Sequence, residues 1–450
     1  MRSIRIGTGA GGCSIERLEP ALDLVDRGNL DYLIFECLSE RTIIEAQQQK
    51  RADPTRGYNS MLEPRMQMVL PSAFAHHVRI ISNMGASNPL GAVRKIAEIA
   101  AEHQLKGLRI AVVLGDDISD RIDKYEDSVL WDRDGTLADL GEILSANVYL
   151  GAEGIVEALR NNADVIITGR IADPSLFVAP LQYEYNFDEN DSHMMGQAIL
   201  LGHLMECCCQ ITGGYYYDEG QKAIQDLWNL GFPIAEMAPD GSFTITKLPG
   251  TGGAVLVDIC KEQLLYEIGN PAAYITPDAI ADFSHVEFTQ VASDVVLSSG
   301  ATSHGRTDTL KVNVGYSDSW VGIAEVSYGG TTSLARARVV AEEVQKRWDF
   351  IGIKPLERNI SFIGYDSMYG PKIASLLSQG ACPEVRLRVA VRARTRTEAE
   401  LLVHEVQCLY INGAAGSAGI DARVFQQLSL ENILVPRCDV PWEVEYLDIS

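Results

Sequence analysis

Short apolar runs that alternate with helical patterns dominate the first 170 residues of the chain. Five runs are rich in β-branched residues and end near glycine or an acidic residue: 3–9, 31–36, 78–85, 108–117 and 164–170. The segments 15–28, 92–107 and 151–162 carry apolar residues at helical spacing. Strands that alternate with helices indicate βαβ units with parallel strands. We therefore predict an α/β domain over residues 1–300, whose mainly parallel sheet is flanked by helices.

The pattern changes beyond about residue 305. Runs 308–316, 320–330, 359–366 and 385–396 have the character of sheet strands, whereas 333–350 and 397–411 have amphipathic helical spacing. This order predicts a smaller α+β domain of two layers over residues 301–450. No low-complexity linker separates the two domains, so we place the boundary between Phe283 and Lys311.

Composition restricts the partners of the chain. It has 450 residues, and 61 acidic residues exceed 38 basic ones, which gives a formal charge of −23. This charge repels nucleic acid and anionic lipid, so we expect neither as a partner, and an anionic ligand must be held by local groups. We find no signal peptide and no membrane span, and the nine cysteines form no CxxC pair. These features predict a cytoplasmic protein with reduced thiols.

Polar residues follow the predicted strands. In parallel sheets, ligands bind beyond the carboxyl ends of the strands. The segments at these ends are 9–12, 36–41, 83–88, 116–117 and 170–173. Glu36, Arg170 and Asp173 are the candidate catalytic or binding side chains among them, and Arg41 is a further candidate cation for a carboxylate.

Two glycine-rich loops are candidate anion sites. The first is Gly7-x-Gly9-x-x-Gly12, with Gly11 inside it, and Glu36 ends the next strand as the acid of a dinucleotide-binding unit would. The second follows Lys247, and its candidate residues are Gly250, Thr251, Gly252 and Gly253. Backbone amides of such loops can bind a phosphate or a carboxylate, but the same loops also serve as simple turns.

Residues 202–214 read GHLMECCCQITGG. If residues 193–211 form one helix, His203, Glu206 and Cys207 share one face, and the three consecutive thiols point in different directions. Three interpretations stay open: a structural hydrogen-bond network, an acid/base pair, and, last, a metal site. We expect no metal among the cysteines, and we expect His203 and Glu206 to face the cleft that collects Glu36, Arg170 and Asp173.

Several long motifs carry a family resemblance. FECLSERT, SNMGASNP, VIITGRIADPSL, GHLMECCCQITGG, PGTGGAVLVDICKEQLLYEIGNPAAYITPD and DTLKVNVGY occur in this order over nearly the whole chain. In them the chain resembles the acyclic terpene utilisation protein family (AtuA family). The resemblance implies a role in the catabolism of branched acyl-CoAs or carboxylates. It also implies a possible small ferredoxin-like partner subunit, and it assigns no reaction and no site residues.

The chemistry of the residues leaves two main function classes and a weaker third. The first is a lyase or hydratase for a branched hydroxy acid or acyl-CoA, with Glu206 or Glu36 as base, His203 as acid, and Arg170 or Arg41 holding a carboxylate. The second is a ligand-binding or scaffolding subunit for an acyl-CoA-processing partner. The third is an NAD-dependent oxidoreductase, which depends on the first glycine loop. The sequence assigns no cofactor, and we expect a homo-oligomer that binds a small anionic substrate.

Overall fold

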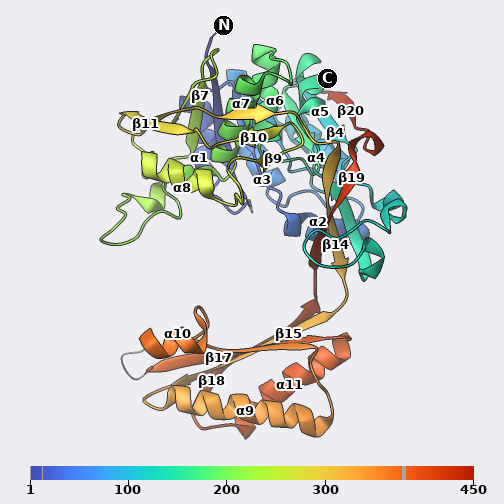
Figure 1. The fold of residues 1–450 in the computed structure, drawn as a ribbon, viewed down its shortest axis with the longest axis vertical. Coiled ribbons are helices and arrows are strands. Elements are labelled where there is room, and N and C mark those ends of the chain that lie inside the picture. The colour runs from blue at the N-terminus through green and yellow to red at the C-terminus, as the bar shows by residue number, and fades with distance from the viewer. Residues whose placement is uncertain (1, 13, 378–381) are drawn as a thin grey trace. The chain divides into compact units, whose positions relative to one another are not determined.

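The computed structural model describes residues 2–12, 14–377 and 382–450, and these form two compact units. The larger unit comprises residues 1–139, 143–315 and 430–450, and the smaller unit comprises 140–142 and 316–429. The chain therefore leaves the larger unit, builds the smaller one and returns (Figure 1).

A ten-stranded sheet lies at the centre of the larger unit. Its order is β11-β12-β8-β7-β1-β2-β3-β6-β4-β20. The five neighbouring strands that run parallel are β1 (Ile4–Ala10), β2 (Tyr32–Phe35), β3 (Arg79–Ser82), β6 (Val165–Thr168) and β4 (Arg109–Leu114). The mainly parallel sheet is confirmed, and the five predicted runs coincide with these five strands. Their β-branched residues are buried on both faces, as helix-covered parallel strands require.

Antiparallel strands extend this parallel core on both sides. On one side follow β7 (Pro233–Met237), β8 (Phe243–Lys247), β12 (Val295–Ser299) and β11 (Glu287–Ala292). On the other side β20 (Glu443–Asp448), from the end of the chain, pairs with β4. The sheet thus combines residues from the two ends of the sequence.

The flanking helices fall into two contiguous groups. One contains α1 (Glu19–Arg27), α3 (Leu62–His76) and α4 (Pro89–Glu102), and the other contains α5 (Glu153–Arg160), α6 (Ser175–Tyr185) and α7 (Ser192–Met205). Helix α1 buries one apolar stripe, whereas α7 is buried along almost its whole length. Two further helices of the larger unit are α2 (Glu40–Ala52) and α8 (Val257–Leu265).

Two three-stranded sheets complete the larger unit. One has the order β13-β10-β9, with β13 (Thr302–His304), β10 (Ile280–Asp282) and β9 (Tyr274–Ile275). The other has the order β19-β14-β5, with β19 (Ser429–Pro436), β14 (Thr309–Ser317) and β5 (Glu142–Val148). The run 308–316 is therefore a strand, but it pairs outside the smaller unit's sheet.

The smaller unit is a two-layer α+β fold, as predicted. Its elements are β15 (Trp320–Gly329), α9 (Ser333–Ile351), β16 (Glu357–Ile363), α10 (Gly370–Leu377), β17 (Glu384–Ala393), α11 (Arg396–Asn412) and β18 (Ser417–Gln426). The sheet order β16-β17-β15-β18 is antiparallel throughout. Apart from α10, this is the split βαβ order of ferredoxin-like folds, so the chain carries such a module itself. Alternate residues of β17 pack against α9 and α11, and Trp348 donates to the Leu402 carbonyl within this core.

Candidate functional site

The carboxyl ends of the parallel strands bring three predicted residues together. Glu36 follows β2, and Arg170 and Asp173 follow β6, with β3 between these strands. Arg170 bridges the two ends, because its guanidinium donates to the carbonyl of Leu38 and to the carboxylate of Asp173. The clustering follows directly from parallel strand order, which places all these ends at one edge of the sheet.

Arg170 is a buried cation, and each of its three guanidinium nitrogens has a hydrogen-bond partner. Its Nε and Nη2 donate to the Ile171 carbonyl at 3.0 Å and 2.7 Å, and its guanidinium lies 4.6 Å from the centre of the Tyr149 ring. Burial alone would lower the pKa of Arg170, but Asp173, Tyr149 and the nearby glutamates raise it above its ordinary value. The guanidinium is therefore a fixed positive charge that orients Asp173.

Glu36 is held by the protein itself. One carboxylate oxygen accepts from the Gly12 amide, and the other accepts from the Leu38 amide and the Asn83 side chain, each at 2.9 Å. Burial, and then the charge of Asp173, raise the pKa of Glu36 well above its ordinary value, against the opposing charge of Arg170. Glu36 therefore joins the electrostatic cluster but has little freedom to move.

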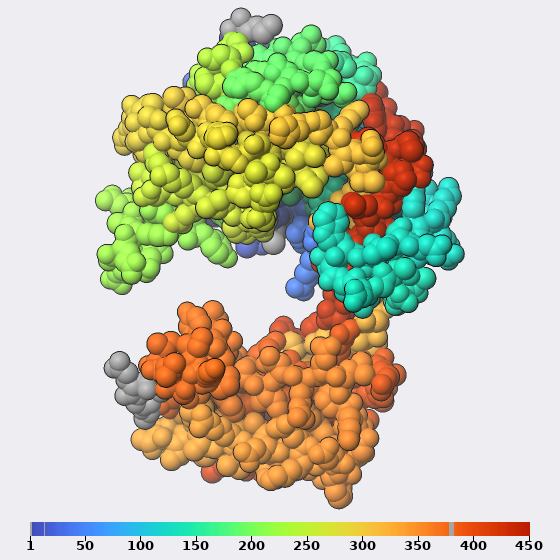
Figure 2. Space-filling view, viewed as in Figure 1, coloured from blue at the N-terminus to red at the C-terminus, as the bar shows by residue number. Residues whose placement is uncertain are grey.

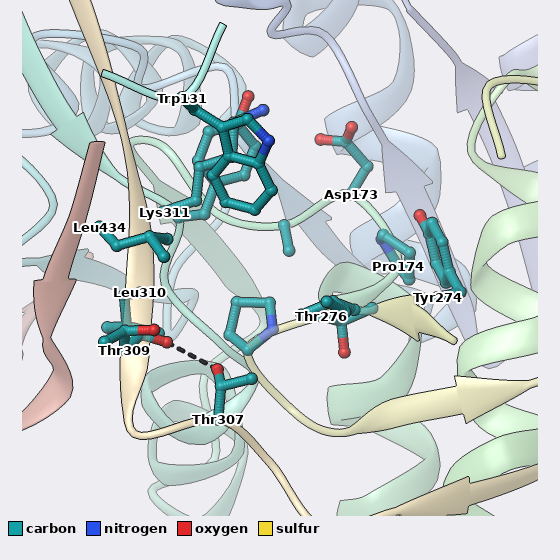
Figure 3. Close-up of a pocket in the computed structure, with 14 residues that line it drawn as sticks. Trp131, Asp173, Pro174, Tyr274, Thr276, Thr307, Thr309, Leu310, Lys311 and Leu434 are labelled. Carbon is teal, nitrogen blue, oxygen red and sulfur yellow. Dashed lines mark hydrogen bonds between the residues drawn. The ribbon is translucent and has the colours of Figure 1, made fainter. Parts of the chain in front are cut away.

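Asp173 lines a cavity of about 280 Å³ in the larger unit (Figure 3). Its side chain retains 34% exposure, whereas that of Arg170 behind it is only 1% exposed. Burial raises the pKa of Asp173, and Arg170 opposes that shift. The other lining residues are mostly apolar or aromatic: Trp131, Tyr149, Ala172, Pro174, Tyr274, Ile275, Thr276, Pro277, Thr307, Thr309, Leu310, Lys311 and Leu434. Such a lining suits a small apolar ligand with a polar head group.

Tyr149 and Lys311 add a second charged group to the cavity wall. The centre of the Tyr149 ring lies 4.6 Å from the Arg170 guanidinium and 4.8 Å from the Lys311 ammonium. Its hydroxyl donates to Glu40, and Lys311 donates to the same carboxylate oxygen at 2.6 Å. The cations Arg170 and Lys311 therefore both lie close to the Tyr149 ring, whose hydroxyl binds Glu40.

His203 and Glu206 form a buried pair. The His203 Nε2 lies 3.0 Å from the Gln263 carbonyl oxygen and 3.2 Å from that of Leu264, so Nε2 carries the proton, since carbonyls only accept. The other ring nitrogen, Nδ1, lies 3.3 Å from a Glu206 carboxyl oxygen. Burial lowers the pKa of His203 to about 4, whereas burial and then Asp173 raise that of Glu206 well above its ordinary value. Burial therefore favours the protonated form of Glu206 and the uncharged form of His203. The role of His203 as an acid stays a prediction.

The position of this pair differs from the expected one. Neither His203 nor Glu206 lines the cavity, although the charges of Asp173 and Arg170 act on Glu206. The rings of Tyr274 and Phe283 pack against the imidazole, with centroids 5.2 Å and 6.0 Å away. Tyr274 also lines the cavity, so its ring separates the pair from the open space.

The continuous helix predicted over residues 193–211 is wrong. Helix α7 ends at Met205, and a 3-10 helix (Cys208–Thr212) follows, because Cys208 adopts a positive φ of 48°. At this break the backbone passes so close to Gly11 that a side chain there would collide with the Glu206 carbonyl oxygen. The thiols of Cys207, Cys208 and Cys209 are free, and burial raises the pKa of each. Within residues 2–12, 14–377 and 382–450, no three metal-ligating side chains come together.

The first glycine loop directs its amides to the protein's own carboxylates. The Gly11 amide donates to Glu16 at 2.9 Å and the Gly12 amide donates to Glu36. A side chain at Gly9 would collide with the Phe35 ring. No helix begins directly after the loop, because α1 starts at Glu19. The geometry that holds a dinucleotide phosphate at a helix N-terminus is therefore not formed here.

The second glycine loop is also bonded internally. The amides of Gly252 and Gly253 donate to the carbonyls of Asn229 and Gln225, and Thr251 donates to the Leu248 carbonyl. Gly250 has a positive φ of 82°, which favours glycine at this turn. Lys247, the cation expected to assist the loop, donates to the Thr251 carbonyl and pairs with Asp294. Anion binding by either glycine loop stays a prediction, and the candidate site is placed at the cavity.

Arg41 does not join the site, because its side chain is 76% exposed and pairs with Glu45 one helical turn away.

Sequence reasoning missed Trp131, Tyr149, Tyr274 and Lys311 as wall residues. Tyr274 and Lys311 lie inside motifs already noted, YITPD and DTLKVNVGY, which was the available signal. Trp131 and Tyr149 carry no local signal, since they reach the cavity only through tertiary packing.

Comparison with known proteins identifies the family of the chain. No helix in the described part of the chain is both long and apolar enough to cross a membrane. No curated protein matches the sequence. The family model of the acyclic terpene utilisation family protein AtuA matches residues 4–446, which includes every residue of the candidate site. The chain therefore belongs to the acyclic terpene utilisation (AtuA) family.

Proposed function

We propose that the protein is an acid/base enzyme, a carbon–oxygen lyase (hydratase) that acts on a branched hydroxy acid or its CoA thioester. The observation that carries this proposal is the position of Asp173, an arginine-held carboxylate in the wall of an apolar cavity. Family membership supports a place in acyclic terpene utilisation, where branched acids are the expected substrates. The acidic chain and its free thiols support a cytoplasmic location.

Asp173 can perform the proton transfers that dehydration needs. As a carboxylate it takes the proton from the carbon next to the substrate carbonyl, and it then delivers this proton to the departing hydroxyl on the same face. A double bond forms, the carbon–oxygen bond breaks, and water leaves, so atoms and charge balance. Arg170 keeps the carboxylate oriented through both steps, and the apolar wall keeps bulk water from the reacting carbons.

The raised pKa of Asp173 supports this role. A carboxylate with a raised pKa is a stronger base than an ordinary aspartate, and a larger fraction of it carries the proton that a general acid must deliver. Burial and then the charge of Asp173 also raise the pKa of the neighbouring Glu206, which favours its protonated form. We therefore assign Asp173 as the catalytic residue, and Arg170, Glu36 and Glu206 as positioning residues.

A ligand-binding subunit for an acyl-CoA-processing partner is the second candidate. It is favoured by the hydrogen bonds of Glu36, which accepts from three groups of the protein and is not free to move a substrate proton. In this case the cavity would bind the acyl chain and Asp173 would only contact its head group.

Proton exchange in D₂O distinguishes the two candidates. Branched 3-hydroxy acids and their N-acetylcysteamine thioesters are incubated with the protein and followed by NMR. We expect deuterium at the carbon next to the carbonyl or formation of an alkene, and Asp173→Asn should slow this by about 100-fold or more. Asp188→Asn, an exposed change of equal charge, is the control. Equal rates for wild type and Asp173→Asn, or no reaction of any substrate, would favour the binding role.

A further inference from the structure

Trp131 forms one wall of the cavity from a segment outside the acid/base cluster. It belongs to a turn over residues 128–137, in which the Leu130 amide donates to the Gly135 carbonyl and the Leu137 amide to that of Ser128. Figure 3 shows Trp131 and Leu434 on one side of the cavity and Asp173 with Tyr274 on the other. The turn is part of the turquoise surface segment in Figure 2. Trp131 thus faces the proposed catalytic carboxylate across the cavity.

Three successive residues fasten this turn to strand β19. The Trp131 amide donates to the Asn432 carbonyl at 2.9 Å, and the Asn432 side chain donates to Asp132 at 3.0 Å. Arg133 pairs with Glu431 at 2.9 Å. A loop held by one backbone bond, one side-chain bond and one ion pair has a defined position, so the backbone that carries the indole is held in place.

Trp131 is largely exposed although it lines the cavity. The residue retains 58% exposure while it lines an apolar cavity, and Leu434 beside it retains 44%. Burying exposed aromatic surface yields roughly 25 cal/mol for each Å² covered, and an apolar chain in the cavity would cover this wall. At roughly 30 Å³ for each water-sized group, the volume of about 280 Å³ accommodates about nine non-hydrogen atoms.

We propose that Trp131 closes the apolar end of the cavity and sets the size of the branched chain that the site accepts. The ligand class is a branched aliphatic acid whose carbon next to the carboxyl group lies at Asp173 and whose tail ends against Trp131 and Leu434. The inference rests on the proposed function for this ligand class only, because a size limit operates on binding and needs no turnover. A chain longer than the cavity must displace the indole or pass beside it.

Calorimetric titration with two free acids tests the size limit. The probes are 3-methylhexanoate, with nine non-hydrogen atoms, and 3,7-dimethyloctanoate, with twelve. We expect wild type to bind the shorter acid more tightly, and Trp131→Ala to lower the ratio of the longer acid's Kd to the shorter acid's Kd by at least about tenfold, since one methylene in a fitted pocket is worth roughly 10-fold or more. Trp131→Phe, a smaller ring, should shift the ratio in the same direction by less.

Trp228→Ala is the matched control, because Trp228 is also exposed but lies within residues 215–230, a light-green projection in Figure 2. This control should leave the Kd ratio unchanged. An unchanged ratio in both Trp131 variants, or no binding of either acid to wild type, would overturn the inference. If the Kd ratio depends on Trp131 but no substrate is turned over, the proposed chemistry is wrong and the size limit stands. If Asp173→Asn loses turnover but the Kd ratio does not change in the Trp131 variants, the size limit is wrong and the proposed chemistry stands.

Discussion

The pair of His203 and Glu206 shows how a polar group is kept in an apolar helix. Both side chains are buried, and a charge on either one would cost several kcal/mol without a partner. The carbonyls of Gln263 and Leu264 fix the proton on Nε2 of the imidazole, and burial raises the pKa of Glu206. Burial thus favours the uncharged form of His203, and Arg170 balances the charge of Asp173.

The lowered pKa of His203 predicts a pH dependence of stability. The folded pKa is about 4 and the ordinary value is 6.5, so between these values the unfolded chain binds more protons. His203 thus contributes stability that is complete above pH 6.5 and is lost as the pH falls towards 4, by about 3 kcal/mol in total. Urea denaturation from pH 4 to 7 should show a shallower acid-side slope in His203→Gln than in wild type. Equal slopes, or a histidine NMR titration near 6.5 assigned to His203, would contradict this account.

Sequence could predict the residues that follow strands but not the walls of the cavity. Glu36, Arg170 and Asp173 cluster because strand order alone puts them at one sheet edge. Trp131 depends on bonds between its turn and residues 431–432, about 300 positions later, which no local pattern encodes. The sequence suggested an anion site at the first glycine loop, because it does not show that the amides of this loop donate to the carboxylates of Glu16 and Glu36.

At the scale of elements, the loop after β1 and the end of α7 determine each other's shape. The loop brings Gly11 against the backbone at residues 206–208, and α7 ends at Met205, just before this contact. Glu36 follows β2, the strand next to β1. Cys208 takes a positive φ at the contact, a conformation that costs an ordinary residue roughly 1 kcal/mol or more. The helix assumed to continue to residue 211 therefore ends at Met205, where the backbone of residues 206–208 packs against Gly11.

This contact predicts that Gly11 tolerates no side chain. Gly11→Ala places a methyl group against the backbone of residues 206–208, which cannot move aside as a flexible side chain would. We expect the free energy of unfolding to fall by about 2–3 kcal/mol, as for overpacking of a core. Gly269→Ala is the control, because a Cβ at Gly269 meets no atom within 4 Å. Equal denaturation midpoints for the two variants would show that the contact is not close.

At the scale of the whole molecule, the two units are interleaved in sequence. All residues that line the cavity belong to the larger unit, and the last residues of the chain pair β20 with β4 in its sheet. The ferredoxin-like unit has its own hydrophobic core. Each unit is thus organised around its own buried residues, although the larger one needs both ends of the chain.

A shortened chain tests this organisation. Replacing residues 316–429 by a short Gly-Ser linker should leave a folded larger unit with a cooperative thermal transition, because its core and cavity keep all their residues. Truncation after Pro436 removes β20 and exposes the edge of β4, so that chain should aggregate or melt at a lower temperature. Circular dichroism melting of both chains provides the measurement. A linker variant without a cooperative transition would show that the larger unit depends on the smaller one.

The central claim is that the cavity between Asp173 and Trp131 is the functional site of this family member. A crystal structure of the protein with 3-methylhexanoate tests it most directly. We predict electron density for the acid inside the cavity, with the carbon next to its carboxylate towards Asp173 and the end of the chain against Trp131. Density at the amides of residues 9–12 or 250–253, with the cavity empty, would contradict the claim and assign the site to the glycine loops.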